Sequence, residues 1–376
     1  MSLDEEVMSK RKNPILKSLI HLYVTLRYKN LSFRGGWALA NSFYKDYMLH
    51  KGNFLRILST HLKGWNYNDW CVLGINDDNR KHYLSSLDYY SLHPFNKEYS
   101  SWIDDKLTLK YVLHGTPAGV YMPDYYFQIE SNGCILSLID CAEDYRGVEG
   151  IIKLLHEQKT LAFKLVRGCL GLGFYKAEYT ADKKYLLNGE EYDEECFVEE
   201  VKGLRGYLVT EYLKPHEAFK KYCDKSVGCL RYIVGRGKKG DIIDIYSFMR
   251  LGTKKSRFVE NYNSGGVLVI VNSEGQYSFG NVIDFERYCN VRIDKHPDNG
   301  IELKGQIPFW SDVVSAAHTV AETLPQLTYM GIDFCVTDDN RIKIIEINSL
   351  TSLDSIQLDK SIYETPGGVF FRERLS

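Results

Sequence analysis

Two acidic residues and an asparagine near the C-terminus have a spacing that suits a metal ion. Residues 331–348 (GIDFCVTDDNRIKIIEIN) are predicted to form two short strands around an Asp-Asp-Asn turn. Side chains alternate between the faces of a strand, so Glu346 and Asn348 are expected on one face, about 7 Å apart. A two-residue loop at Asp339–Asn340 then places Asp333 directly opposite Glu346.

These three oxygen-bearing side chains, on one face of an otherwise apolar hairpin, predict a Mg²⁺ site. Burying two carboxylates together costs free energy unless a cation neutralises them. Hard oxygen ligands of this kind suit Mg²⁺. The alternative is an exposed edge hairpin with incidental acids, but isoleucines at positions 342, 344, 345 and 347 leave no obvious solvent face.

A second segment, in the middle of the chain, has residues that suit a phosphate. Residues 161–166 are predicted as a strand that carries Lys164 and runs into a loop with Gly168, Gly171 and Gly173. Glycines let backbone N–H groups turn toward a phosphate, and a nearby lysine supplies charge. The order Gly-Lys-Ser/Thr is absent, which argues against a P-loop NTPase. A plain glycine-rich turn is the alternative.

Another glycine pattern, Gly235-x-Gly237-x-x-Gly240, has the spacing of a dinucleotide-binding loop. That loop requires a helix after it, whose N-terminus holds the pyrophosphate. Here a strand-like run (DIIDIYSFM) follows instead. The pattern is therefore predicted to be a hairpin turn.

The elements around these segments predict an α+β chain with antiparallel sheets. Residues 14–63 have apolar side chains at helical spacing, and residues 64–100 are irregular and linker-like. Asp104–His114 is predicted as a helix with Asp at its start. From about residue 120 short β-like runs dominate, interrupted by one clear amphipathic helix, Ser311–Leu324, which Pro325 closes.

Composition narrows the class of protein. The chain of 376 residues is 44% hydrophobic and 26% charged, and its net charge of -2 gives no global basic field for nucleic acid. Nine cysteines without a C-x-x-C pair predict reduced, buried thiols in a cytoplasmic protein. The acidic N-terminus does not suit a signal peptide, and no apolar run is long enough for a membrane span.

A basic cluster near the N-terminus leaves room for a peripheral membrane contact. It consists of Lys10, Arg11, Lys12 and Lys17. A solvated helix face is the preferred interpretation. Oligomeric state is not predicted.

The order of these pieces resembles the ATP-grasp superfamily of carboxylate–amine ligases. Lys106 lies in Asp-Asp-Lys-Leu, Lys164 precedes the glycine-rich loop, Thr210-Glu-Tyr-Leu213 follows, and Asp333 and Glu346-Ile-Asn348 close the set. In detail the chain resembles the sugar-transfer-associated ATP-grasp group, which occurs among surface-polysaccharide genes. The further motifs that carry this likeness are His296-Pro-Asp-Asn-Gly300 and Gly305-Gln-Ile-Pro-Phe-Trp310. The likeness covers roughly residues 100–376.

The resemblance implies two α+β lobes that grip ATP between them. It implies a division into a helical N-terminal region and linker (1–100), a first lobe with the phosphate loop (101–213) and a second lobe with the metal site (214–376). No chemistry is assigned to the first hundred residues.

The resemblance also implies roles in nucleotide binding. Lys106 and Lys164 would bind phosphates, with Lys176 as a competitor that is better explained as solvent-facing. The loop from Gly168 to Gly173 would close over the β- and γ-phosphates. Residues 210–213 would form a hinge that reads adenine through the backbone, with Glu211 and Leu213 as its named members.

The remaining roles concern metal and substrate. Asp333, Glu346 and Asn348 would hold two Mg²⁺ ions. Arg231 and Arg250 would face the γ-phosphate or the substrate carboxylate, although each also suits a surface position on a β-ribbon. The residues implied near the acceptor are Asn263, Gly265, Gly266 and His296, the last of which equally suits a capped loop histidine.

The expected activity is ATP-dependent amide or peptide bond formation through an acyl phosphate. The genomic habit of the group suggests an amino acid joined to a uronic-acid sugar or a related surface-glycan modification. The substrates would then be a small-molecule or glycan carboxylate and an amine. Two alternatives stay open: an ATP-grasp kinase, in which a hydroxyl attacks, and a non-catalytic nucleotide- or glycan-binding protein.

Overall fold

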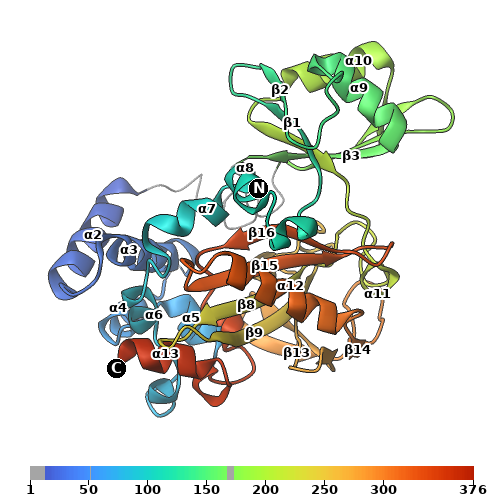
Figure 1. Ribbon diagram of the computed structural model, residues 1–376. Helices are drawn as coiled ribbons and strands as arrows, with labels where there is room; N and C mark the ends of the chain where they lie inside the picture. The colour runs from blue at the N-terminus through green and yellow to red at the C-terminus, as the bar shows by residue number, and fades with distance from the viewer. Residues whose placement is uncertain (1–12, 51, 167–172) are drawn as a thin grey trace.

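The computed structural model describes residues 13–50, 52–166 and 173–376. Two seven-stranded sheets, each antiparallel throughout, form the body of the molecule, and a group of helices stands beside one of them (Figure 1). This arrangement confirms the predicted α+β class with antiparallel sheets and a helical N-terminal region.

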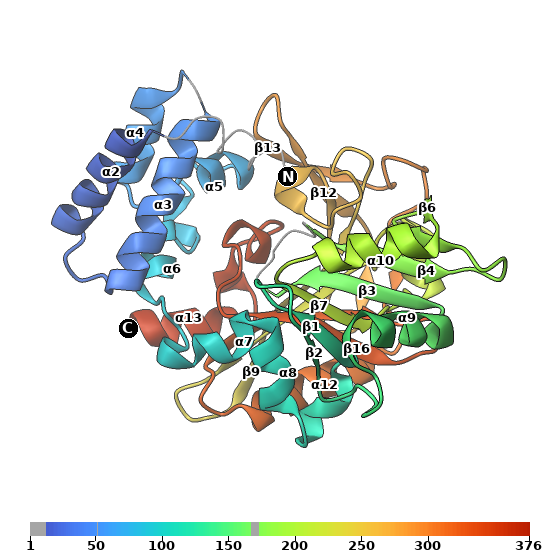
Figure 2. The ribbon, with the colours of Figure 1, turned by 90° about the horizontal axis from the view of Figure 1, so that it is seen from above.

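The N-terminal helices form a small unit with its own apolar core. They are α2 (Pro14–Arg27), α3 (Phe33–Leu49) and α4 (Phe54–Leu62), which confirms the helical prediction for this region. Ile20 and Val24 of α2 pack against Leu39 and Phe43 of α3. Seen from above, these helices lie to one side of both sheets (Figure 2).

The segment 64–100 is more regular than predicted. It contains α5 (Tyr67–Val72), η1 (Arg80–His82), α6 (Ser86–Ser91) and η2 (Lys97–Ser100). Polar residues that suggested a linker are helix caps: the Asn66 side chain accepts from the backbone N–H of Asp69, and Ser85 accepts from that of Asp88. The prediction of an irregular linker is therefore wrong.

The first sheet has the strand order β2-β1-β7-β3-β4-β5-β6. Its strands are β1 (Tyr125–Ile129), β2 (Ile135–Ser137), β3 (Thr160–Leu165), β4 (Tyr175–Tyr179), β5 (Tyr185–Leu187), β6 (Glu190–Tyr192) and β7 (Tyr207–Glu211). Helices α9 (Gly147–Gln158) and α10 (Glu194–Gly203) cover one face, where Leu155 and Phe197 are buried with Phe127 and Phe163. The sequence analysis missed both helices.

The second sheet has the strand order β13-β12-β10-β9-β8-β15-β16. Its strands are β8 (Leu230–Arg236), β9 (Ile242–Leu251), β10 (Val267–Ile270), β12 (Gly280–Asp284), β13 (Cys289–Ile293), β15 (Tyr329–Val336) and β16 (Ile342–Asn348). A separate pair joins β11 (Gln276–Tyr277) to β14 (Gly305–Gln306). Further short elements are α11 (Glu217–Lys220), η4 (Tyr262–Ser264), η5 (Asp354–Ile356) and η6 (Ile362–Glu364).

Helices cover both faces of the second sheet. On one face lies α12 (Trp310–Thr323), one residue from its predicted bounds, with Val313 and Val320 fully buried. On the other lies α13 (Gly368–Leu375), whose Phe370 packs on Tyr329. The turn at residues 237–241 joins β8 to β9, which confirms that the second glycine pattern is a hairpin.

Residues 101–122 share the core of the second sheet. They form α7 (Ser101–Asp104), α8 (Lys106–Leu113) and η3 (Pro117–Tyr121), and Leu113 is buried in one cluster with Ile332 and Ile344. Asp105 caps α8 by accepting from the backbone N–H of Thr108. The three-part division of the chain stays a prediction, and this packing favours placing residues 101–122 with the second sheet.

Two further predictions concern membranes and thiols. Across the described residues, no helix combines the length and apolar character that crossing a membrane requires. The described cysteines are free thiols, but Cys134 and Cys196 are exposed, so the prediction that all are buried is wrong.

Candidate active site

The hairpin of β15 and β16 brings Asp333 opposite Glu346, as predicted, but through a different register. The loop between the strands has three residues, 338–340, instead of two, and Asn340 takes a left-handed backbone conformation (φ 67°). A β-bulge that leaves Ile345 without a direct partner then shifts the pairing back by one residue. The two differences cancel, and both carboxylates lie side by side.

Two arginines from neighbouring strands neutralise Asp333, which is 1% exposed. Arg231 of β8 binds it with two hydrogen bonds, Nε to Oδ1 at 2.6 Å and Nη2 to Oδ2 at 2.5 Å. Arg250 of β9 adds Nη2 to Oδ2 at 2.7 Å. Burial alone would raise the pKa of Asp333, but the two guanidinium groups outweigh it and hold the pKa at about 2. The alternative of two surface cations is therefore wrong.

Glu346 is more accessible and has weaker partners. Its Oε2 lies 3.4 Å from Lys106 Nζ, and its Oε1 lies 3.9 Å from Arg231 Nη2. Asn348 donates Nδ2 to Oε1 of Glu346 at 3.2 Å. The Asp104 carboxylate accepts from the backbone N–H and hydroxyl of Ser349, which ties α7 and the Lys106 helix to the end of β16.

The oxygen atoms of Asp333, Glu346 and Asn348 suit a hard cation as ligands. Oδ2 of Asp333 accepts from both arginines, whereas Oδ1 accepts from Arg231 alone and so retains one lone pair. Glu346, with 28% of its side chain exposed, and the amide oxygen of Asn348 complete an all-oxygen set. The described residues include no group of three or more His, Cys, Asp or Glu side chains that suits a metal, so the fit depends on this mixed carboxylate–amide set.

Lys164 faces this cluster from the first sheet. Its Nζ donates to the hydroxyl of Tyr125 at 3.2 Å and lies 4.6 Å from the centre of that ring. Burial lowers the pKa of Lys164 to about 7, and the positive charge of Lys106 adds to the effect, while Glu346 opposes it. Because Lys106 and Glu346 belong to the second sheet's body, the two sheets bring their charged groups together. Sequence analysis missed Tyr125, which no motif marks.

The structure describes one of the three glycines that are predicted to bind phosphate. Gly168 and Gly171 lie outside the described residues. Gly173 has a φ of 66°, and a Cβ there would lie 2.8 Å from the Tyr207 hydroxyl, so the position requires glycine. Lys176 of β4 forms an ion pair with Glu178 at 2.7 Å and is one-third exposed.

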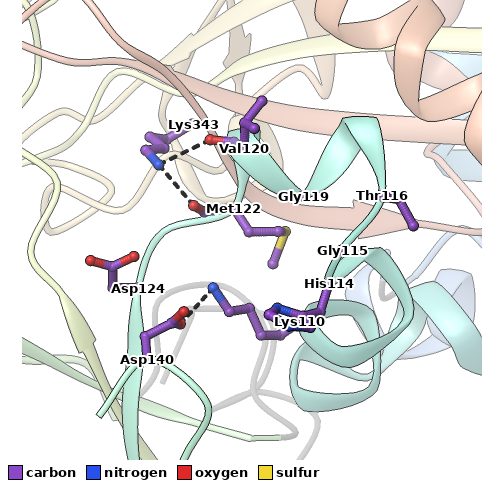
Figure 3. Close-up of a pocket in the computed structure, with 10 residues that line it drawn as sticks. All are labelled: Lys110, His114, Gly115, Thr116, Gly119, Val120, Met122, Asp124, Asp140 and Lys343. Carbon is purple, nitrogen blue, oxygen red and sulfur yellow. Dashed lines mark hydrogen bonds and ion pairs between the residues drawn. The ribbon is translucent and has the colours of Figure 1, made fainter. Parts of the chain in front are cut away.

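A polar pocket lies beside the junction of the two sheets, and none of the predicted site residues lines it (Figure 3). Its volume is about 380 Å³. Lys110 forms an ion pair with Asp140 at 2.6 Å on one side, and Lys343 donates to the carbonyls of Val120 and Met122 on the other. Lys110 therefore links α8 to the segment after β2, and Lys343 links β16 to η3.

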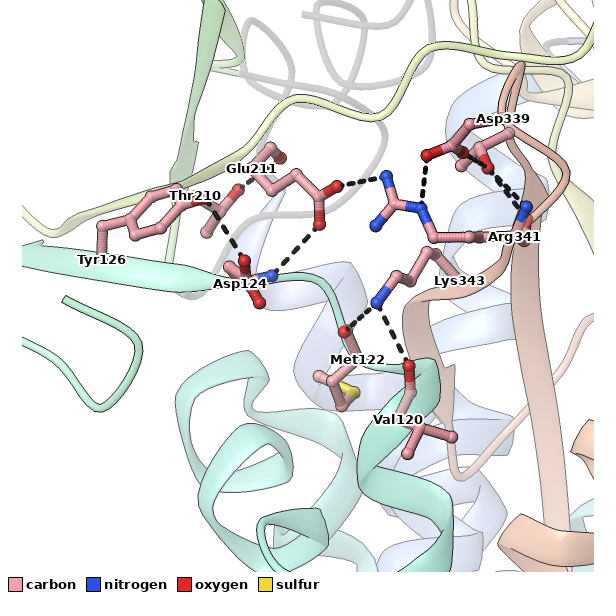
Figure 4. A network of polar contacts seen from close by, with 10 residues as sticks. Val120, Met122, Asp124, Tyr126, Thr210, Glu211, Asp339, Arg341 and Lys343 are labelled. Carbon is pink, nitrogen blue, oxygen red and sulfur yellow. Dashed lines mark hydrogen bonds and ion pairs between the residues drawn. The ribbon is translucent and has the colours of Figure 1, made fainter. Parts of the chain in front are cut away.

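The predicted hinge connects the two sheets through a polar network (Figure 4). Glu211, at the end of β7, binds Arg341 of the β15–β16 hairpin with 2.7 Å between Oε1 and Nη2. Its Oε2 accepts from the backbone N–H of Asp124. Beyond the half-buried Leu213, Lys214 accepts at its carbonyl from the backbone N–H of Asp338. The hinge residues therefore contact both bodies.

The four predicted substrate residues belong to loops that follow Arg250. Asn263 lies in η4, Gly265 has a φ of 99° and accepts from the Thr253 hydroxyl, and Gly266 donates its N–H to the Asn261 carbonyl. His296 is 1% exposed and its Nε2 lies 3.2 Å from the Gly252 carbonyl. Enclosure of the ring favours the interpretation of His296 as a structural loop histidine.

Comparison with known protein families decides what kind of site this is. Residues 86–365 match the family described as sugar-transfer associated ATP-grasp. The chain belongs to this family. The match confirms the predicted ATP-grasp fold. It begins in α6, earlier than the predicted likeness.

Three solved structures are similar to part of this ATP-grasp chain. N5-carboxyaminoimidazole ribonucleotide synthetase from Thermotoga maritima is 14% identical (TM-score 0.34), over 70% of this chain and 49% of that one. The ATP-grasp ligase PsnB complexed with minimal precursor is 12% identical (TM-score 0.38), over 74% and 63%. Biotin carboxylase from Campylobacter jejuni is 13% identical (TM-score 0.39), over 72% and 46%. The chain spans about half the length of the first of these, and curated proteins gave no match.

Two residues that position Arg250 in this ATP-grasp site were not predicted. Cys229 Sγ accepts from Arg250 Nη2 at 2.9 Å. Glu260 accepts from the backbone N–H groups of Gly228 and Cys229, and burial raises its pKa to about 7, although Arg250 opposes the shift. The Nε of Arg250 is buried without a hydrogen-bond partner among the described residues, so it is a donor available to an anion. Glu260 is ten positions from Arg250, and no spacing rule joins them.

Proposed function

We propose that this ATP-grasp protein is an ATP-dependent carboxylate–amine ligase. The observation that carries the proposal is one polar cluster in which Asp333, Glu346 and Asn348 lie beside Arg231 and Lys106. Lys164 and the unpartnered Nε of Arg250 extend its positive charge. Such a cluster suits a substrate with several negative oxygens held next to a hard cation.

The chain's own residues would divide the work of binding Mg²⁺ and ATP. Glu346, the amide oxygen of Asn348 and Oδ1 of Asp333 would hold Mg²⁺. Two such ions, when bound, offset negative charge on the phosphoryl group that is transferred. Lys164 and Lys106 would bind phosphate oxygens, because both are cations that face the acidic pair from two different bodies.

The two arginines, Arg231 and Arg250, would orient the substrate carboxylate that ATP phosphorylates. Arg250 has a buried Nε without a hydrogen-bond partner among the described residues, and Arg231 helps to hold Asp333 ionised. The carboxylate oxygen would attack the γ-phosphorus, the bond to the bridging oxygen would break, and ADP would leave with its electrons. The amine would then attack the acyl carbon, lose a proton and displace inorganic phosphate, which gives an amide.

The proposed substrates are a uronic-acid sugar or its glycan and an amino acid. This part of the proposal rests on the family description, which associates these ATP-grasp proteins with sugar transfer. The loop of Asn263, Gly265 and Gly266 would contact the acceptor. Because the reaction consumes ATP, we place it in the cytoplasm.

The experiment is ADP release with sets of uronic acids and amino acids, singly and combined. A ligase releases ADP fully only when both an acid and an amine are present. With the active acid labelled by ¹⁸O in its carboxylate, one labelled oxygen must appear in the released phosphate. Phosphate that stays on an alcohol product would instead support a kinase, and ADP release with no acceptor dependence would contradict the ligase.

A further inference from the structure

The N-terminal helix α2 carries an apolar stripe that stays exposed among the residues that the structure describes. Ile15, Leu19, Leu22 and Leu26 recur at helical spacing and are 54% to 73% exposed. The opposite face of the same helix is buried against α3. A helix on the surface of a domain needs only one apolar face, the one that packs on the core. The fold therefore does not explain the second apolar face of α2, and such exposed patches often mark an interaction site.

Two exposed aromatic residues stand at the start of α3. Phe33 is 85% exposed and Trp37 51%, and their rings stack with centroids 6.2 Å apart. Trp37 contacts the ring of His21 at 4.3 Å, and Lys17 Nζ lies 5.6 Å from its centre. Lys17 and His21 lie on another side of α2 from Ile15, Leu19, Leu22 and Leu26, so this aromatic pair is a separate exposed patch, and the four residues of α2 alone are called here the α2 stripe. Helix α2 lies at the edge of the molecule, apart from both sheets (Figure 2).

This part of the chain is also strongly basic. Residues 13–63 contain eight Lys and Arg residues and a single acid, Asp46, although the whole chain has a net charge of -2. Asp46 is 1% exposed, and its carboxylate is bound by His61 and by the backbone N–H of Tyr67. Arg27 of α2 and Arg34 of α3, among the eight, are exposed.

We propose that the α2 stripe docks on a lipid bilayer with anionic headgroups. An exposed apolar stripe along one helix, in a strongly basic part of the chain, matches a helix that lies in the plane of a membrane interface. Basic residues add attraction to anionic lipid that salt screens. In the sequence before α2, Lys10, Arg11 and Lys12 balance Asp4, Glu5 and Glu6, so the first 63 residues keep the net charge of +7 (eight Lys and Arg minus one acid) that residues 13–63 have.

The positive charge of this part of the chain favours an anionic bilayer over a second copy of the chain as the partner. A symmetric pair would bring two basic surfaces together, because the first 63 residues contain eleven Lys and Arg residues and only four acids. An anionic bilayer offers both an apolar layer and opposite charge. Docking there would hold the ATP-grasp body at a membrane surface, a property that is independent of the proposed reaction.

The test is flotation of the full-length protein with vesicles. One set is phosphatidylcholine alone, and the other contains about one third phosphatidylglycerol. The variant Leu19→Gln/Leu22→Gln replaces the two leucines at the centre of the stripe by glutamine, which is polar and a good helix former. The matched control, Leu136→Gln/Val369→Gln, changes two equally apolar side chains that are each 41% exposed elsewhere. A third variant, Arg27→Gln/Arg34→Gln, removes charge only.

The proposal predicts binding to the anionic vesicles that falls with salt. Apparent affinity should drop at least about tenfold in the Leu19/Leu22 variant and less in the arginine variant, whose salt dependence also weakens. The control variant should bind as the original does. Equal binding by all variants, or binding to neither vesicle, would overturn the proposal. A dimer in solution that the Leu19/Leu22 variant abolishes would assign the α2 stripe to a second copy. ATP binding measured without vesicles reports separately on the proposed ligase.

Discussion

Asp333 keeps its negative charge in a buried position because two arginines bind its oxygens. Sequence reasoning required a cation for this acidic pair, and the structure supplies Arg231, Arg250 and Lys106. Removing one carboxylate therefore removes attraction to cations rather than repulsion between acids. Glu346→Gln is therefore not expected to stabilise the free protein.

Glu346→Gln should leave the fold intact and abolish most turnover. The lost contacts are partly exposed, so the free energy of unfolding should fall by no more than about 1 kcal/mol. Turnover should fall roughly a thousandfold, because the metal loses its most accessible carboxylate. ADP release and urea unfolding measure the two effects. Glu191→Gln, which breaks an exposed ion pair with Lys184, is the control. Near-normal turnover in Glu346→Gln would refute the metal assignment.

Nucleotide binding should take up protons above neutral pH. The pKa of Lys164 in the free protein is about 7, below its ordinary 10.5, so this side chain is mainly neutral at pH 8. Phosphates favour its charged form, so affinity should fall as pH rises from about 7, by up to about tenfold per pH unit. Calorimetry in two buffers of different ionisation enthalpy counts the protons. The uptake should vanish in Lys164→Met; if it persists, another group is responsible.

At the scale of elements, the hinge depends on contacts between distant segments. Glu211 at the end of β7 and Arg341 at the hairpin turn are far apart in sequence and 2.7 Å apart in space. Arg341 also binds Asp339 within its own turn. The pair therefore sets where the β15–β16 hairpin lies relative to the strand that leads into residues 212–216.

Breaking this pair should weaken nucleotide binding more than it weakens the fold. Arg341→Gln removes a half-exposed ion pair, so stability should change by less than about 1 kcal/mol. ATP affinity should fall several-fold, because the hinge loses a contact that orients it. Lys184→Gln, which breaks an exposed pair on the β5–β6 hairpin, is the matched control for calorimetric titration. Equal affinities of the two variants would show that the hinge does not need Arg341.

Elements with strong local patterns were predictable, and those that depend on context were not. The strands that carry Lys164 and Arg231 and the helix α12 follow from apolar spacing. The pairing of Asp333 with Glu346 was predicted correctly, but with a two-residue loop in place of a three-residue loop. The β-bulge at Ile345, which compensates for the difference, has no signal in the sequence. The polar residues at 64–100 suggested a linker, since a cap and a loop use the same side chains.

The same limit applies within the candidate site. Residues with a family motif, such as Lys164 and Glu346, were predicted. Tyr125, Glu260 and Cys229 act on a lysine or an arginine from other strands and loops, so only the folded chain reveals them. Gly168 and Gly171 lie outside the described residues and stay predictions.

At the scale of the whole molecule, charged groups from two bodies meet at one site. Lys164 belongs to the first sheet, whereas Lys106, Asp333 and Glu346 belong to the second sheet and the helices packed on it. A nucleotide bound between them would contact both bodies at once. It should therefore stabilise the whole chain, and only when Mg²⁺ accompanies it.

The most direct test of the account is the thermal stability of the purified protein with Mg²⁺ and a non-hydrolysable ATP analogue. Ligand at about 100 times its Kd should add about 2.7 kcal/mol and raise Tm by a few degrees. We expect this rise to need Mg²⁺, to be largely lost in Glu346→Gln and to be retained in Glu191→Gln. No rise at saturating nucleotide, or an equal rise in Glu346→Gln, would contradict it.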